Sequence, residues 1–444
     1  MYPFIPLYSS NSIQKLEAPF EKQQLTFHVI GVPYNKTSKE YGLCAFTQNT
    51  FNFCKMMKEQ GHTVLHYGNE GSNPDCDENV VIFNQSEFQQ YCGKFEAEWK
   101  TKHWAWKYED DCHTHFSNKV INQLEQRLPS KRQSKNGHKE FIITFWGNPL
   151  SKVFFHFQQR AIIVQAGIGY GGGMNIGYEI FGSNSHRSFY LNNNFKDQHP
   201  FLPNPFRAVI PHFVDPADFT YSKFKKNYVL FLGRLIFGKG LHTLIRATAL
   251  SGDILVVAGS GSVKDIVQDC QDVKNIPHAF YPEEPLTIDE CKHVVEFGYA
   301  NLEQRRNLLA NAKCTMIAST YLEPFGMSMI ESFISGTPVI TPDHSSFWEH
   351  NLHGLTGYRC RDLNDYVLAL KNIHKIKHEI VRKYGEKFST SEIGKMYDDY
   401  FQRLNVHENT PKSLIPLYQV SNVPVDMEKK MDIEKVINDF KVLL

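Results

Sequence analysis

Short apolar runs alternate with amphipathic stretches along most of the chain, and this pattern predicts its fold class. Residues 25–32 and 63–67 form apolar runs of strand length, and residues 45–59 place apolar side chains at helical spacing between them. Further apolar runs at 141–145 and 161–165 each lead into a loop that contains glycine. Because strands that alternate with helices are typical of parallel sheets, the first half of the chain is predicted to form a doubly wound α/β domain.

The same alternation begins again after residue 213. Strands are predicted at 228–232, 254–258, 314–319 and 338–341, and helices at 241–250, 302–312 and 329–335. The polar and aromatic region 85–139 is too weakly periodic to be assigned a helix or strand. The expected fold is α/β, with two Rossmann-like doubly wound domains that face each other across a cleft, where the carboxyl ends of the strands hold a ligand. The predicted parts are an N-terminal extension (1–24), a first domain (25–212), a second domain (213–385), a helix with the option of packing back on the first domain (386–404) and a tail (405–444).

The composition is that of an ordinary globular protein, and it argues against several functional classes. Of the 444 residues, 41% are hydrophobic and 21% are charged, and a net charge of +1 leaves no basic excess for binding nucleic acid. Nine cysteines without a C-x-x-C spacing argue against a disulfide framework or a zinc site. The N-terminus lacks the features of a signal peptide, and no apolar run approaches the roughly 20 residues of a membrane span. A cytoplasmic location is therefore predicted, and peripheral membrane contact is left open.

The most specific stretch is the run EPFGMSMIE at 323–331, which lies between a predicted strand and a predicted helix. Pro324 and Gly326 interrupt the strand, so the two carboxylates of Glu323 and Glu331 flank a tight turn. Backbone N–H groups at the start of the following helix form a ready site for a phosphate group. The second carboxylate, about one turn inside the helix, can accept hydrogen bonds from sugar hydroxyls. Two glutamates at this spacing are a weak signal, but the complete string between strand and helix is specific.

A second informative string, GRLIFGKG at 233–240, follows the predicted strand at 228–232. It places Arg234 and Lys239 on a glycine-rich loop at the end of that strand. A diphosphate leaving group carries about two negative charges, and its neutralisation in a dehydrated cleft requires cations that are held in place. This loop is therefore a candidate diphosphate site, and a solvated basic loop is the alternative.

Together these two strings resemble the nucleotide-sugar motifs of retaining glycosyltransferases of family 4, which have the GT-B fold. The resemblance covers approximately residues 25–405. It implies that Arg234 and Lys239 grip the donor pyrophosphate. It also implies that Glu331 binds the ribose hydroxyls and that Glu323 touches the donor sugar. The donor-binding set that it implies further includes Gly233, Gly259, Gly261, Gly298, Tyr299, Phe325, Gly326, Met327 and Ser328.

Two strings in the first domain resemble a viral and bacterial subset of the same family. They are GLCAFTQ at 42–48 and QAGIGY at 165–170. Glycines in such loops let the backbone approach a sugar or phosphate closely. The residues predicted on the acceptor side are Gly42, Gly169 and Tyr170. The subset usually has an acidic residue at the position of Gln165, so this chain departs from it there.

Two histidines and two further motifs are weaker candidates for a functional site. His156 and His212 are candidate cleft histidines, although a lone histidine is more often structural. Glycines at 167–172 match the G-x-G-x-x-G fingerprint of dinucleotide sites, but no acidic residue follows about 20 positions later. Asp75 and Asp77 match the D-x-D metal motif of another glycosyltransferase fold, but they lie in a loop rich in Asn and Pro. No metal site is predicted.

The resemblance implies a metal-independent, retaining hexosyl- or pentosyltransferase of glycan or glycoconjugate synthesis. Such an enzyme moves a sugar from a UDP- or GDP-linked donor to a hydroxyl of a glycan, glycoprotein or glycolipid, and it requires no cofactor besides this nucleoside diphosphate sugar. In this family a front-face displacement is favoured. The alternatives are a catalytically silent relative that binds nucleotide sugars, and a GT-B epimerase or phosphorylase. A silent relative is expected to lose a cation or a carboxylate, and all four are present here.

Overall fold

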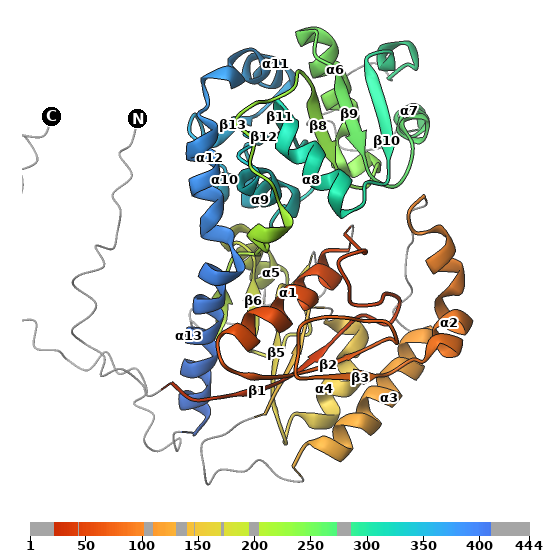
Figure 1. Cartoon of the computed structure of the whole chain (residues 1–444), viewed down its shortest axis with the longest axis vertical. Coiled ribbons are helices and arrows are strands. Elements are labelled where there is room, and N and C mark those ends of the chain that lie inside the picture. The colour runs from red at the N-terminus through yellow and green to blue at the C-terminus, as the bar shows by residue number, and fades with distance from the viewer. Residues whose placement is uncertain are drawn as a thin grey trace, which may run out of the picture.

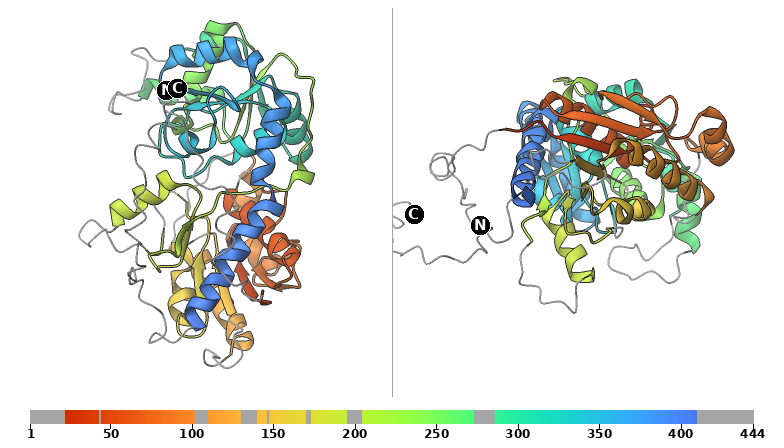
Figure 2. Two further views of the ribbon diagram at one scale, coloured as in Figure 1. Left: turned by 90° about the vertical axis from the view of Figure 1, so that its left-hand side faces the viewer. Right: turned by 90° about the horizontal axis from the view of Figure 1, so that it is seen from below.

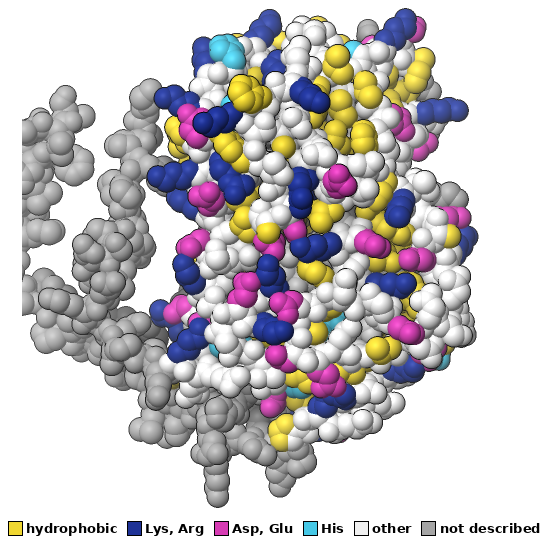
Figure 3. Space-filling view, in the orientation of Figure 1, with side chains coloured by type: hydrophobic (Ala, Val, Ile, Leu, Met, Phe, Trp, Pro, Cys, Tyr) yellow, Lys and Arg dark blue, Asp and Glu magenta, His cyan; other side chains and the backbone are white. Residues whose placement is uncertain are grey.

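The computed structural model describes residues 22–42, 44–101, 110–129, 140–145, 147–169, 173–194, 204–272 and 286–409. Two parallel sheets, each covered by helices, lie one above the other (Figure 1). On the face shown in Figure 3, basic and acidic side chains are interspersed over both domains, which agrees with the net charge of +1. The predicted fold class, two doubly wound α/β domains, is confirmed.

The first sheet has seven strands in the order β3-β2-β1-β4-β5-β6-β7, and all of its pairings are parallel. Its strands are β1 (Thr26–Ile30), β2 (Thr63–Gly68), β3 (Glu78–Val81), β4 (Glu140–Thr144), β5 (Ile162–Gln165), β6 (Glu179–Phe181) and β7 (Arg207–Val209). The helices of this domain are α1 (Ala45–Glu59), α2 (Gln85–Glu98), α3 (Asp111–Arg127), α4 (Ser151–Phe157) and α5 (Asn184–Asn194). Helix α1 has the bounds that the apolar spacing predicts.

The second sheet has six parallel strands in the order β10-β9-β8-β11-β12-β13. Its strands are β8 (Val229–Leu232), β9 (Leu255–Ala258), β10 (Val294–Gly298), β11 (Cys314–Met316), β12 (Val339–Pro342) and β13 (Gly357–Cys360). Its helices are α6 (Leu241–Ser251), α7 (Val263–Asp272), α8 (Leu302–Asn311), α9 (Met327–Ile334), α10 (Ser346–His350), α11 (Leu363–Asn372) and α12 (His378–Gly385). In both sheets the strand order reverses beside the first strand, which is where ligands of such sheets bind.

Two helices form in the region 85–139, to which the sequence pattern assigns no element. Asn84 caps α2 by accepting a hydrogen bond from the backbone N–H of Glu87, and the Glu87 side chain accepts one from the N–H of Asn84 in return. Only a narrow apolar face of α2 is buried, and it includes Cys92. The region was missed because its helical stability comes from caps and tertiary packing more than from a wide apolar stripe.

A long C-terminal helix, α13 (Thr390–Asn409), runs from the second domain down the side of the first (Figures 1 and 2). Its Phe401 ring lies 4.7 Å from that of Phe27 in β1, and its Tyr397 ring lies 5.4 Å from that of Phe53 in α1. The chain thus crosses between the domains twice. The two crossings lie side by side, because the N–H of Val214 donates to Phe388 O at 3.0 Å.

Candidate active site

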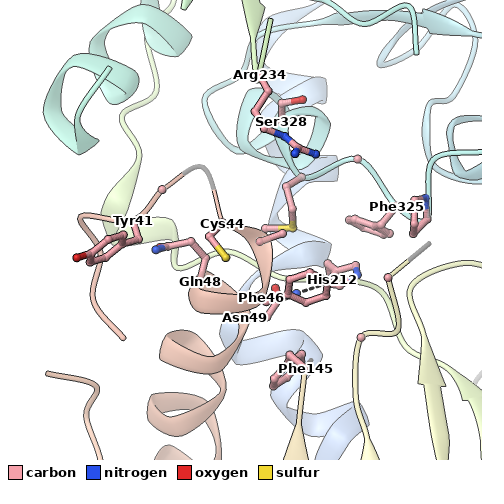
Figure 4. Close-up of a pocket in the computed structure, with 18 of the residues that line it drawn as sticks. Tyr41, Cys44, Phe46, Gln48, Asn49, Phe145, His212, Arg234, Phe325 and Ser328 are labelled. Atoms are coloured by element: carbon pink, nitrogen blue, oxygen red, sulfur yellow. Dashed lines mark hydrogen bonds between the residues drawn. The ribbon is translucent and has the colours of Figure 1, made fainter. Parts of the chain in front are cut away.

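A cavity of about 800 Å³ lies between the two domains and is lined by residues of both. Arg234 and Ser328 approach it from the second domain, and Phe46 and His212 lie on the opposite side (Figure 4). The predicted residues that line it are Gly42, Gly169, Gly233, Arg234, Lys239, Glu323, Phe325, Gly326, Met327, Ser328 and Glu331. The structure therefore brings both cations and both carboxylates of the two motifs to one cavity.

Glycines shape the loop that carries the two cations. A Cβ atom on Gly259 would lie 1.7 Å from the carbonyl oxygen of Gly233, where β8 ends. Gly240 has φ +69°, and a Cβ atom there would lie 1.9 Å from Ala318 O. Both positions need glycine because backbone approaches backbone closely. Gly259 and Gly261 do not line the cavity, so their visible contribution is to let the loop with Arg234 and Lys239 fold against β9.

Lys239 and Glu323 form an ion pair inside the cavity. The Nζ atom of Lys239 lies 2.7 Å from Glu323 Oε2, and the Ser319 hydroxyl donates to the same oxygen at 3.1 Å. Burial alone would raise the pKa of the Glu323 carboxyl, but the Lys239 ammonium and the hydrogen bonds stabilise its charged form and hold the pKa below its usual value. One cation and one carboxylate of the predicted site are thus already paired.

Glu331 lies inside α9 and does not cap it. The helix begins after Gly326, whose φ of +95° favours glycine, and no side chain caps it. Neither Glu323 nor Glu331 therefore caps α9 through its side chain. The Glu331 carboxylate is instead held by Arg305 of α8, which donates from Nη2 and, at 3.2 Å, from Nε.

Arg305 also lines the cavity and was missed by the sequence analysis. It is 26 residues from Glu331 along the chain, and no local spacing connects the two. Only the packing of α8 against α9 brings them together. A cation in the first turn of a helix is unfavourable toward the helix dipole, and this was the only signal that could have singled it out.

Gly298 is the last residue of β10 and Tyr299 follows it, and both lie outside the cavity lining. The Tyr299 hydroxyl donates to Glu40 O, and its ring meets the Trp99 ring edge-on at 5.0 Å. In this structure Tyr299 therefore joins the second domain to the first. The place of Gly298 and Tyr299 in the donor-binding set stays a prediction, and Tyr170 lies outside the described residues.

The charges of the cavity are divided between the domains. Its charged lining residues all come from the second domain, and they are Arg234, Lys239, Arg305, Glu323 and Glu331. The first domain contributes glycines, aromatic rings and uncharged polar groups. At Gly169 a Cβ atom would lie 2.7 Å from the ring of Phe46, so a side chain there would displace that ring. The arrangement suits an anionic ligand on one side and a neutral one on the other.

The second domain matches a known protein family. Residues 218–387 match the family model of glycosyl transferases group 1. The second domain is a group 1 glycosyltransferase domain. An uncharacterized glycosyltransferase from Methanocaldococcus jannaschii is 31% identical over 177 residues, which are 36% of this chain and 42% of that protein. The chain spans 39–46% of the length of the curated relatives that it matches.

The likeness to solved structures covers both domains. A glycosyltransferase involved in avilamycin A biosynthesis superposes with a TM-score of 0.57 at 15% identity, over 86% of this chain and 98% of that one. A pneumococcal O-GlcNAc transferase in complex with UDP and GlcNAc gives a TM-score of 0.56 at 12% identity, over 86% and 99%. These neighbours are GT-B glycosyltransferases, so the predicted GT-B fold is confirmed.

Of the two candidate histidines, His156 and His212, only His212 lines the cavity beside the glycosyltransferase domain. Asn49 of α1 hydrogen-bonds His212 Nδ1 at 2.8 Å, and the His212 ring packs 5.0 Å from that of Phe325 (Figure 4). Burial, together with the nearby His186 and His350, lowers the pKa of His212 to about 3. His156 lies outside the cavity and pairs with Glu125 at 2.6 Å.

The buried His212 makes stability depend on pH. Below about pH 6.5 the unfolded chain binds a proton at this residue, whereas the folded chain does so only near pH 3. The free energy of unfolding should therefore fall on acidification, by about 1.4 kcal/mol per pH unit for this group. In urea unfolding at pH 7, 6 and 5, the His212→Asn variant should lose less stability than the wild type. The exposed His156→Asn serves as the matched control, and an equal pH dependence in all three proteins would contradict the prediction.

The two aspartates of the D-x-D motif make local contacts in the first domain. Asp75 pairs with Lys58 at 2.7 Å, and Asp77 accepts a hydrogen bond from the Val64 N–H at 2.8 Å. No group of three or more His, Cys, Asp or Glu side chains among the described residues is arranged to hold a metal ion. Within the same residues, no helix is both long and apolar enough to cross a membrane.

Proposed function

We propose that the chain is a retaining, family 4 glycosyltransferase that moves a sugar from a nucleoside diphosphate to an acceptor hydroxyl. The observation that carries the proposal is the convergence of Arg234, Lys239, Glu323 and Glu331 on one cavity. Two cations at the end of β8 suit the diphosphate leaving group, because its charge develops in a site with little water. Two carboxylates beside them suit the hydroxyl groups of the ribose and the donor sugar.

Each part of the cavity has a role in this proposal. Arg234 and Lys239 stabilise the departing diphosphate, and N–H groups at the start of α9 bind phosphate or donor hydroxyls. Glu331 accepts hydrogen bonds from the ribose, and Glu323 contacts the donor sugar. The uncharged wall of the first domain receives the acceptor, for which a glycan, glycoprotein or glycolipid hydroxyl is proposed. The displacement takes place on one face of the sugar, and the protein's cations take the electrostatic role of a metal.

The donor nucleotide is proposed to be UDP or GDP, with UDP first. UDP is supported by the pneumococcal O-GlcNAc transferase, which was solved with UDP and GlcNAc and shares this fold. Release of nucleotide that depends on an acceptor is the decisive test of transfer. A silent binding protein releases none, and an epimerase or phosphorylase does not require the acceptor hydroxyl.

Free UDP or GDP should raise the melting temperature of the protein, because a ligand that binds only the folded state stabilises it by about 2.7 kcal/mol at 100 times its Kd. UMP and GMP, which lack the second phosphate, are the matched controls and should stabilise less. A thermal-shift series with all four nucleotides measures this. Transfer activity should also survive EDTA. Complete loss in EDTA with recovery in Mn²⁺ would contradict the assignment of the metal's role to Arg234 and Lys239.

A further inference from the structure

The Glu331 carboxylate is connected to the first domain through a single side chain. Arg305 donates from Nε and Nη2 to the two oxygens of Glu331, and from Nη1 to the carbonyl oxygen of Gly42 at 2.8 Å. The first two contacts lie within the second domain, and the third reaches the loop between β1 and α1 of the first domain. We refer to Glu331, Arg305 and the Gly42 carbonyl as the Arg305 bridge.

The two charged side chains of the bridge are largely shielded from water. The side chains of Arg305 and Glu331 are 12% and 6% exposed, and all three residues line the cavity. A carboxylate that is desolvated to this extent beside an anionic ligand requires a counter-charge. The planar guanidinium supplies that charge and directs five N–H donors in fixed directions, so it can hold both partners at once. Each carboxylate oxygen keeps a lone pair for another donor.

The loop that receives the third contact also lines the cavity. Gly42 follows Tyr41, a cavity residue, and precedes the start of α1. Two neighbouring contacts attach the same loop to the second domain, because Lys39 pairs with Asp218 and the Tyr299 hydroxyl donates to Glu40 O. Of these three contacts, only that of Arg305 links the loop to Glu331, the carboxylate that is proposed to bind the nucleotide.

We propose that Arg305 is a cross-domain positioning residue that couples nucleotide binding to the position of residues 39–42. This inference rests on the proposed function, since it assigns Glu331 to the ribose. When the ribose hydroxyls bind Glu331, they fix its carboxylate, the carboxylate fixes the guanidinium, and the guanidinium fixes the Gly42 carbonyl. A nucleotide bound at the donor site therefore fixes the position of residues 39–42 without contacting them. These residues lie beside the uncharged wall that is proposed to receive the acceptor.

The glycine at position 42 allows the bridge to be broken from the first domain alone. A Cβ atom on Gly42 would lie 2.6 Å from Arg305 Nη1, and the next nearest atom is Cζ of the same guanidinium at 3.9 Å. The far end of a flexible side chain moves before the backbone does, so Gly42→Ala should displace Arg305 from the carbonyl. Arg305→Met removes the whole bridge, and Arg305→Lys keeps the charge without the planar fork.

The experiment is calorimetric titration of UDP and GDP into the full chain and its variants. Arg305→Met should weaken the affinity of the nucleotide that binds by at least about tenfold, and Arg305→Lys by less. Gly42→Ala should also weaken it, although residue 42 belongs to the first domain. The double variant Gly42→Ala/Arg305→Met should be no weaker than Arg305→Met, because both changes break the same contact. Arg246→Met is the matched control, since this arginine pairs with Glu290 at 3.0 Å and lies outside the cavity.

Hydrogen exchange gives a readout that does not depend on activity. In the wild type, nucleotide should slow the exchange of the amides of residues 39–42, and in Arg305→Met and Gly42→Ala this protection should be lost. Wild-type affinity of Gly42→Ala, or losses that add in the double variant, would overturn the coupling while the proposed function stands. Failure of the wild-type chain to bind UDP or GDP would overturn the proposed function and the coupling with it.

Discussion

Replacing Arg234 by alanine is expected to lower turnover of the nucleoside diphosphate sugar by about 10²- to 10³-fold, because one preorganised charge that stabilises the leaving group is lost. Arg234 reaches the cavity from the loop after β8, on the same side as the start of α9 (Figure 4). Arg234→Lys should recover only part of the rate, since a lysine cannot bind a diphosphate through two parallel N–H groups. Initial rates at saturating donor and acceptor measure both effects.

Lys239→Ala should lower turnover to a similar extent and should also destabilise the fold. Its ammonium is the cation of a partly buried pair with Glu323, and its removal leaves the Glu323 carboxylate without this counter-charge. Arg246→Ala is the control for both cation variants, because Arg246 pairs with Glu290 at 3.0 Å on α6 and lies outside the cavity. Turnover near the wild-type rate in both Arg234→Ala and Lys239→Ala would show that the diphosphate site is elsewhere.

Replacing Glu331 and replacing Glu323 are expected to impair different steps, nucleotide binding and sugar transfer. Glu331→Gln keeps the side-chain shape but weakens charge-assisted hydrogen bonds to the ribose, each worth about 1.5–3 kcal/mol. Binding of plain UDP or GDP should therefore weaken by about 10- to 150-fold. Glu323→Gln should leave the binding of plain nucleotide nearly intact and lower transfer from the complete donor, because Glu323 is proposed to contact the sugar.

Calorimetry with the nucleotide and with the intact sugar nucleotide, on each variant, separates these outcomes. Melting temperatures measured in parallel account for stability, because each glutamate is also the partner of a partly buried cation. Ser345→Ala is a control beside the site, since its hydroxyl donates to the backbone oxygen of Glu323 at 2.7 Å and leaves the carboxylate unchanged. Equal losses for both ligands in both glutamate variants would refute the division of roles.

Local patterns predicted much of this fold because they act over a few residues. The apolar spacing of 45–59 gives the bounds of α1, and the turn formed by Pro324 and Gly326 precedes α9. The strands β1, β2, β4, β5, β8, β9, β11 and β12 fall within a few residues of the predicted runs, since parallel strands buried on both faces read as continuous apolar segments. The sequence pattern assigned no run to β3, β6, β7, β10 and β13. The loop that contains Gly240 could also be predicted, because a glycine-rich string is itself a local signal.

Contacts between distant segments could not be predicted in the same way. Arg305 acquires its place from the packing of α8 on α9 and from a carbonyl 263 residues away. Tyr299 belongs to the donor-binding set that the resemblance implies, yet its ring packs on Trp99 of the first domain. Such contacts depend on how the two folded domains pack against each other. Neither the hydrophobic period nor the spacing of motifs contains information about that packing.

The path of α13 has a consequence for the order in which the protein is made. Five of its residues belong to the apolar core of the first domain, together with Phe27 and Phe53, and they are Ile393, Tyr397, Tyr400, Phe401 and Leu404. A ribosome reaches them only after it has synthesised the entire second domain. Since domains emerging from the ribosome fold from the N-terminus onward, the first domain begins to fold early but completes its core last. A chain interrupted before residue 390 leaves that apolar face uncovered.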